Sequence, residues 1–104
     1  MIRRGEKLMT LITNKSLGNY RGNDVELCRT THTRVGDETV RRLLDASIPF
    51  SAVTERIPFM ERAKYHGAKS FYVIRTNPRR YSQARNLIRE MDMTMRSRLV
   101  VSNY

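Results

Sequence analysis

The sequence predicts a small α+β domain in which two helices cover one side of a single, mainly antiparallel sheet. The prediction rests on the order of the hydrophobic patterns, which read strand, helix, strand, strand, helix along the chain. A short apolar run, Leu99–Val101, can add a fourth strand near the end. The other expected elements are Val25–Thr31, Asp37–Ala46, Ile48–Thr54, Ser70–Thr76 and Pro78–Met91.

The first strand and the first helix are predicted from two different hydrophobic periods. Val25 and Leu27 alternate with polar residues, which is typical of a strand that is covered on one side. Gly36 is expected to break the chain, and Asp37 is expected to cap the helix that follows. The apolar residues of this helix recur at the spacing of one helical face, and they are Val40, Leu43 and Leu44.

The second half of the domain is predicted to hold an edge strand, a long connection and a central strand. Pro49 at the start of the second strand favours an edge position, because proline cannot donate a hydrogen bond to a neighbouring strand. The connection 55–69 is long, and its segment 59–65 can form one or two helical turns. The run Phe71–Ile74 is apolar on both faces, which is typical of a central strand.

Two helices can cover only one face of the predicted sheet, so the other face of the central strand needs cover of its own. Either Phe71 and Val73 or Tyr72 and Ile74 lie on that open face. The cover can come from the N-terminal segment, from the connection 55–69 or from a second subunit. We therefore predict an interface or open sheet face at these four residues, and a homo-oligomer.

Length and composition favour one domain in a reducing compartment. The 104 residues divide into a basic N-terminal extension, 1–24, and a single domain, 25–104. The single cysteine, Cys28, excludes an intramolecular disulfide, which suits the cytoplasm. The start of the chain lacks a long apolar segment, so we expect a cytoplasmic location and no membrane partner.

The net charge of +10 predicts an anionic partner. Sixteen arginines and four lysines outnumber ten acidic residues. Such a field attracts nucleic acid, acidic lipid headgroups, phosphorylated ligands or acidic proteins, and charge alone does not choose among them. The alternative is a soluble basic surface that has no specific partner.

The segment Arg75–Arg80 is the best candidate for an anion-binding site. Asn77 followed by Pro78 is a helix start signal, and arginines in a first turn face the positive end of the helix dipole. An anion bound there would reverse this unfavourable interaction and accept hydrogen bonds from free backbone N–H groups and guanidinium groups. The alternative is that the arginines extend into solvent. The candidate anion-binding residues are Arg75, Asn77, Arg79 and Arg80.

The sequence contains no recognisable catalytic or metal-binding motif. Cys28, His32 and His66 match no known zinc-ligand spacing and lack a fourth ligand. As a cysteine–histidine nucleophile pair they lack a third group to orient the histidine. We therefore expect no catalytic residues, no metal, no cofactor and no enzymatic activity.

The run from Val25 to Met91 resembles a family of small bacterial proteins of unknown role, the prokaryotic signal-transducing proteins, which are similar in fold to the nitrogen-regulatory PII proteins. The resemblance is carried by Val25–Leu27, Val40–Phe50, Phe71–Ile74 and Tyr81–Ala84. Ser47 stands where the family has glycine. The resemblance implies a ferredoxin-like βαββα(β) sandwich and a regulatory or ligand-binding role by analogy, and it implies no site residues.

These observations together predict a small regulatory or ligand-binding module that forms a homo-oligomer and binds an anionic small molecule. Two alternatives stay open. An RNA- or DNA-binding protein would contact phosphates with its arginines and stack bases on Phe71 or Tyr72, although the segment 66–71 does not fit the pattern of an RNA-recognition strand. A structural or interaction subunit would need no small ligand.

Overall fold

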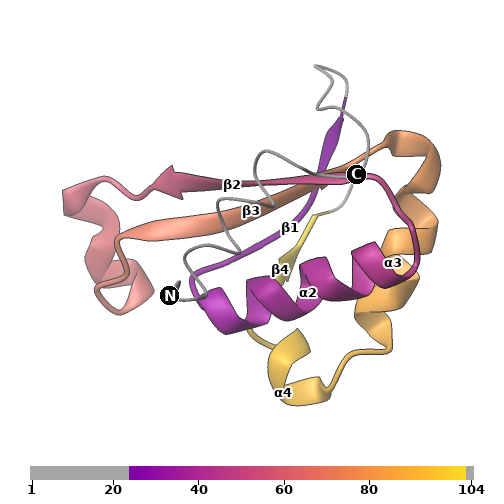
Figure 1. The fold of residues 1–104 in the computed structure, drawn as a ribbon. Coiled ribbons are helices and arrows are strands. Elements are labelled where there is room, and N and C mark those ends of the chain that lie inside the picture. The colour runs from indigo at the N-terminus through magenta and orange to yellow at the C-terminus, as the bar shows by residue number, and fades with distance from the viewer. Residues whose placement is uncertain (1–23, 103–104) are drawn as a thin grey trace, which may run out of the picture.

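The computed structural model describes residues 24–102, which adopt an α+β fold (Figure 1). Within these residues the sheet has four strands, paired antiparallel in the order β2-β3-β1-β4. The strands are β1 (Val25–Thr30), β2 (Phe50–Arg56), β3 (Ser70–Thr76) and β4 (Val100–Val101). The helices are α2 (Thr33–Asp45), α3 (Tyr81–Arg89) and α4 (Met93–Arg96), with the 3-10 segments η1 (Phe59–Tyr65) and η2 (Pro78–Arg80). The predicted N-terminal extension lies outside the described residues, apart from Asp24.

The strand positions agree with the hydrophobic patterns. The α+β class and the antiparallel sheet are confirmed, β2 is an edge strand, and β3 lies between β2 and β1. Ile48 and Pro49 precede β2 rather than opening it, and the strand instead continues to Arg56. The connection after β2 contains η1, so the predicted helical turns at 59–65 are confirmed as a 3-10 segment.

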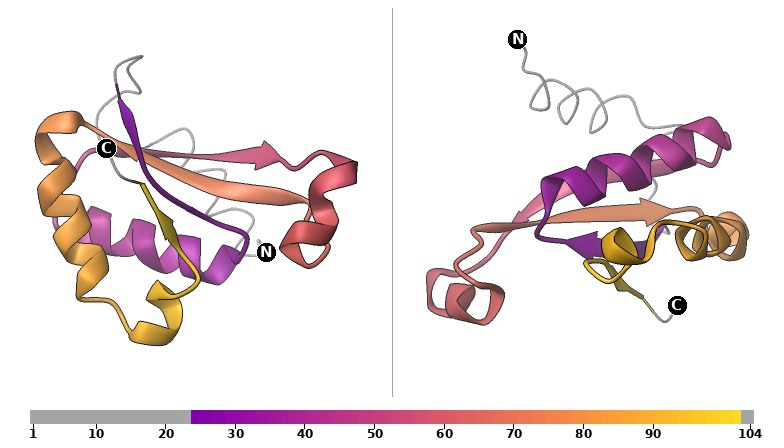
Figure 2. Two further views of the ribbon diagram at one scale, coloured as in Figure 1. Left: turned by 180° about the vertical axis from the view of Figure 1, so that it is seen from behind. Right: turned by 90° about the horizontal axis from the view of Figure 1, so that it is seen from below.

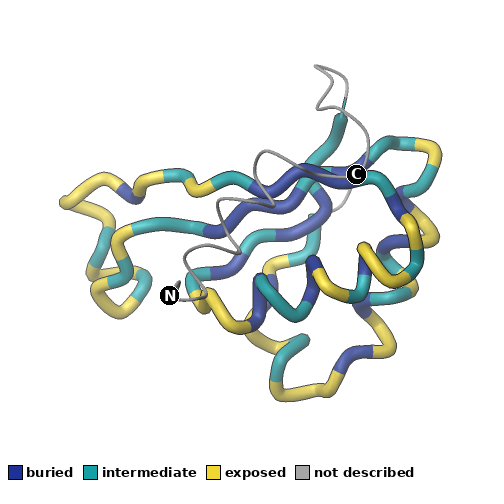
Figure 3. Tube along the Cα trace, in the orientation of Figure 1, coloured by how far each residue is buried: buried dark blue, intermediate teal, exposed yellow. Residues whose placement is uncertain are grey.

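The core lies between one face of the sheet and the helices α2 and α3. Helix α2 packs against β1, β2, β3 and α3, and α3 packs against β1 (Figures 1 and 2). Figure 3 shows that burial concentrates in the strands and on the inner sides of these helices, whereas η1 has no buried residue. The core includes Leu27, Phe50, Ile74, Val40, Leu43, Ala84 and Ile88.

Helix α2 begins earlier than predicted, because Gly36 lies inside it rather than before it. The helix starts at Thr33, with His32 at the N-cap position and no side-chain hydrogen bond to the first turn. Gly36 is buried against the ring of Tyr72, and a Cβ atom at this position would lie 2.7 Å from Cγ of that ring. The glycine therefore permits a close approach between α2 and β3, and it does not break the chain before the helix as predicted.

Tyr72 fixes α2 to the sheet with a hydrogen bond as well as with its ring. Its hydroxyl donates to Oδ1 of Asp37 over 3.1 Å. Burial raises the pKa of Tyr72, which keeps this donor protonated, and burial also raises the pKa of Asp37. Asp37, predicted as the helix cap, is thus an interior helical residue that bonds to β3.

The last predicted helix, Pro78–Met91, is divided into η2 and α3. The predicted cap is confirmed, because the side chain of Asn77 accepts a hydrogen bond from the backbone N–H of Arg79 over 2.8 Å. The backbone N–H of Arg80 donates to the carbonyl of Asn77 over 2.9 Å, which closes a tight 3-10 turn before α3 begins. Met91 lies beyond α3 but is buried in the core.

Among residues 24–102, no helix combines the length and the apolar character that crossing a bilayer would require.

The first prediction concerns Gly36. Replacing a helical glycine by alanine usually stabilises a protein by up to about 1 kcal/mol. At this position we expect Gly36→Ala to lower the free energy of unfolding by about 1–3 kcal/mol, because the new methyl group meets the Tyr72 ring. Urea denaturation measures the difference. Arg41→Ala, at an exposed site of the same helix, is the control and should change stability little. A stabilising Gly36→Ala would contradict the packing described.

The second prediction concerns the end of α2, where Ser47 has a left-handed backbone with φ of 57°. The N–H groups of Ser47 and Ile48 donate to the carbonyls of Leu44 and Leu43, each over 3.0 Å, which is the Schellman pattern that normally uses glycine. We expect Ser47→Gly to raise the free energy of unfolding by about 1 kcal/mol, because glycine adopts this backbone without strain.

The control for this prediction is Ala46→Gly, at the neighbouring position with φ of −93°. There glycine relieves no strain and only adds freedom to the unfolded chain, so we expect a loss of about 0.5–1 kcal/mol. Thermal denaturation of the two variants separates the effects. Equal shifts of the same sign would show that backbone strain at Ser47 is not the cause.

Candidate anion-binding site

The structure does not gather the four predicted anion-binding residues around one point. Arg75 lies on β3, where its Nη2 is 3.9 Å from Oε2 of Glu55. Asn77 uses its side chain to cap η2, and Arg80 donates from Nε to Oε1 of Gln83 over 2.8 Å. Arg79 is exposed. Arg75 therefore has an acidic neighbour on the sheet, and the other three belong to the turn that starts at Asn77.

The four apolar residues of β3 divide between its two faces. Tyr72 and Ile74 belong to the core beneath the helices, so these two do not lie on the open face predicted for them. The physical reason is the two-residue repeat of a strand, which sends neighbouring side chains to opposite faces. Phe71 and Val73 consequently lie on the outer face, where the cross-strand partners of Val73 are Val53 and Arg29.

Ion pairs lie on this outer face. The guanidinium group of Arg29 donates to both carboxylate oxygens of Glu26, over 2.6 and 2.8 Å, and lies 3.4 Å from Glu55. The hydrogen bonds from Arg29 lower the pKa of Glu26. Arg29 also lies over the ring of Phe71, 5.0 Å from its centroid, and the ring of Tyr65 meets Phe71 edge-on. The outer face is therefore partly charged, with its arginines engaged by carboxylates and by an aromatic ring.

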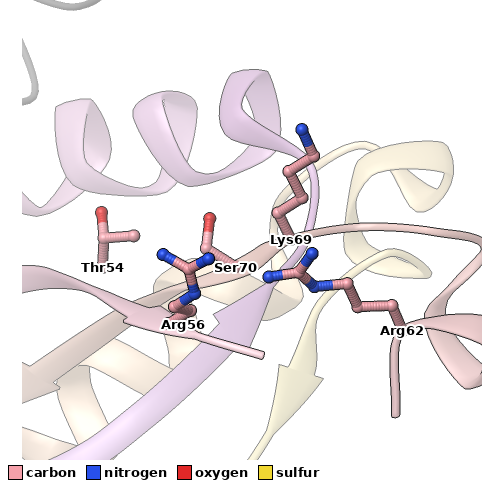
Figure 4. Close-up of a pocket in the computed structure, with 5 residues that line it drawn as sticks. All are labelled: Thr54, Arg56, Arg62, Lys69 and Ser70. Carbon is pink, nitrogen blue, oxygen red and sulfur yellow. The ribbon is translucent and has the colours of Figure 1, made fainter. Parts of the chain in front are cut away.

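A cationic pocket lies at the opposite end of β3 from Asn77. It has a volume of about 300 Å³, and Figure 4 shows its lining side chains. Arg56 and Arg62 extend toward one another beside Ser70, while Lys69 rises along the rim. The lining consists of Thr54, Arg56, Arg62, Lys69 and Ser70. We call this site the Arg56–Arg62–Lys69 pocket.

The pairing of β2 with β3 places one side of this pocket. Arg56 lies directly opposite Ser70, and Thr54 lies opposite Tyr72. Because side chains two residues apart share a face, Thr54, Arg56 and Ser70 all lie on the helix side of the sheet, beyond Tyr72.

The connection between the two strands brings in the remaining cations. Ile57 is buried, and its backbone N–H donates to the carbonyl of Lys69 over 2.8 Å. Arg62 is held from η1 by a hydrogen bond from its Nε to the carbonyl of Ile57 over 3.1 Å. His66 and Gly67, both with positive φ, then reverse the chain toward β3. Ile57 therefore fixes the side chain of Arg62 and the backbone at Lys69.

The electrostatics of the pocket favour a bound anion. Its lining holds three cationic groups and two hydroxyl groups, and among the described residues no carboxylate contributes to it. The ion pairs of residues 24–102 involve Arg29, Arg42 and Arg75, and none of the pocket cations. Cations that share a site repel one another, and an anion would offset that repulsion and accept hydrogen bonds from guanidinium, ammonium and hydroxyl groups.

Hydrophobic patterns do not predict this pocket, because its residues come from the end of one strand, the connection after it and the start of the next strand. Arg56 ends one strand, Arg62 lies in the middle of the connection and Lys69 precedes the next strand. The available signal was the connection 55–69 itself, which is unusually long and rich in cations.

Cys28, His32 and His66, the residues considered for metal or nucleophilic chemistry, differ in burial. Burial raises the pKa of Cys28 to about 12, so its thiol stays protonated, whereas His32 and His66 are exposed. Within the part of the chain that the structure describes, no group of three His, Cys, Asp or Glu side chains is placed to hold a metal ion.

Comparison of the chain with protein-family models, with curated proteins and with solved structures found no match in any of the three.

Proposed function

We propose that this chain is a small, non-enzymatic ligand-binding module with a regulatory role, and that it binds an anionic ligand in the Arg56–Arg62–Lys69 pocket. The observation that carries the proposal is that three cations line one pocket and have no carboxylate partner among the described residues. A phosphate group suits this lining, because its oxygens accept several hydrogen bonds and its charge matches several cations.

For the fold, we propose the ferredoxin-like sandwich implied by the family resemblance. Two observations support it. The main elements follow one another as strand, helix, strand, strand, helix, strand, and the strand order β2-β3-β1-β4 separates β1 from β2 by the inserted strand β3. The regulatory role rests on the resemblance to the signal-transducing family alone, and the cytoplasmic location rests on the single cysteine.

The nucleic-acid alternative receives less support at the outer face of the sheet, where base stacking was expected. The ring of Phe71 already contacts Arg29 and Tyr65, and Tyr72 is buried beneath α2. The carboxylates of Glu26 and Glu55 on the same face would repel phosphate groups. A purely structural subunit would leave without a role the pocket cations, which have no carboxylate partner among residues 24–102.

The third prediction tests the pocket with inorganic phosphate. We expect the double variant Arg56→Gln/Lys69→Gln to bind phosphate at least about tenfold more weakly than the original chain, because it loses two charged donors. Isothermal titration calorimetry at low salt measures the affinities, and the binding of the original chain should weaken as salt is added.

The matched control is Arg79→Gln/Arg80→Gln, which removes the same charge from the other candidate site. We expect it to retain phosphate binding, apart from the small loss that follows a lower net charge. A loss confined to this control would move the anion site to the turn at Asn77. Equal losses in both double variants would indicate only a general effect of charge.

The fourth prediction concerns assembly, and it follows from the sequence rather than from a contact in the structure. We expect native mass spectrometry of the purified protein to show a homo-oligomer, and the same spectrum would report a ligand that co-purifies. A spectrum that contains only the monomer across micromolar concentrations would contradict the oligomer.

A further inference from the structure

An exposed apolar pair lies next to the Arg56–Arg62–Lys69 pocket. Phe59 and Met60, at the start of η1, have 80% and 88% of their surface exposed. Figures 1 and 2 show η1 at the end of β2 and β3, away from α3. Two neighbouring apolar side chains this exposed are unusual on a small domain, and such groups commonly mark a binding surface.

One residue joins the pair to the pocket. Arg62 lines the pocket, and its guanidinium carbon lies over the ring of Phe59, 5.7 Å from the ring centroid. The ring of Phe59 therefore lies beside one of the three pocket cations. The other exposed large apolar residues among those described are Leu44, Met93 and Val100. They lie on α2, α4 and β4, and none of them lines this pocket.

The size of the pocket leaves room for more than a phosphate group. A volume of about 300 Å³ is at the lower end for small-molecule sites. A phosphate group with several attached atoms fits such a space, and a ligand held there can continue onto the neighbouring surface. The neighbouring surface next to Arg62 is the ring of Phe59.

We propose that the ligand is a nucleotide unit, whose phosphate lies among Arg56, Arg62 and Lys69 and whose base stacks on Phe59. The inference rests on the proposed anion-binding function and names its ligand class. A nucleotide has the two groups that this site can bind, a phosphate and a flat ring system. Bases stack on exposed aromatic rings and on guanidinium planes, and Phe59 and Arg62 offer one of each.

The experiment compares inorganic phosphate, ribose 5-phosphate and adenosine 5′-monophosphate by calorimetry. We expect the adenine ring to strengthen binding about tenfold over ribose 5-phosphate, the gain that base stacking on one aromatic ring commonly gives. Phe59→Leu should abolish this gain, so that adenosine 5′-monophosphate binds this variant no more tightly than ribose 5-phosphate does, because leucine keeps the apolar bulk but removes the ring. Phe59→Tyr should retain the gain. Because Phe59 is exposed, neither variant should disturb folding.

The outcomes separate the two proposals. If inorganic phosphate does not bind the original chain, the anion-binding function itself fails. If phosphate and ribose 5-phosphate bind but adenine adds nothing, only the nucleotide inference fails. Phe59-dependent binding to phosphatidylserine vesicles, without a preference for adenine, would also overturn it and would point to a lipid surface.

A final comparison distinguishes the source of the nucleotide. A single-stranded oligomer of ten adenosine nucleotides is titrated beside the mononucleotide. Tighter binding of the oligomer that Phe59→Leu weakens would support the inference with a single strand as the source. Equal or tighter binding of the mononucleotide, again lost in Phe59→Leu, would support it with a free nucleotide as the source.

Discussion

The pairing of β3 with strands on both sides is the constraint on which the rest of the structure depends. Through this pairing each residue of β3 has a fixed neighbour and a fixed face. Tyr72 is thereby turned toward α2, where its ring meets Gly36 and its hydroxyl bonds to Asp37. A shift of one residue would reverse every face, exposing Tyr72 and burying Arg75, so the register is held by the cost of burying charge.

The same pairing separates two kinds of arginine. On the outer face, Arg29 and Arg75 form ion pairs with the carboxylates of Glu26 and Glu55, which offset their charge. On the helix side, Arg56 lies opposite Ser70, where none of the pocket residues carries a carboxylate. A net charge of +10 is therefore a poor guide to function by itself, because the surroundings decide which cations can take an external anion.

Sequence patterns predicted the strands better than the helix starts and the site. The run Ser70–Thr76 was placed correctly, since a central strand flanked by polar residues has a clear apolar pattern. The start of α2 was missed because Gly36 is typical of a break, and only the Tyr72 ring packed against it explains a buried helical glycine. The pocket was missed because Arg56, Lys69 and Ser70 meet only through strand register, which a local pattern does not contain.

The anchoring of the long connection explains why a solvent-exposed segment can still form a defined site. Ile57 is buried, and through its backbone it bonds both to the carbonyl of Lys69 and to the side chain of Arg62. Ile57 thus fixes the side chain of Arg62 and the backbone at Lys69, while strand pairing fixes the backbone at Arg56. Arg62 therefore has less side-chain freedom to lose when a ligand binds, whereas the exposed side chains of Arg56 and Lys69 must be ordered by the ligand. The exposed ring of Phe59 lies on the same segment, 5.7 Å from the guanidinium carbon of Arg62, which places an apolar surface beside a cationic one.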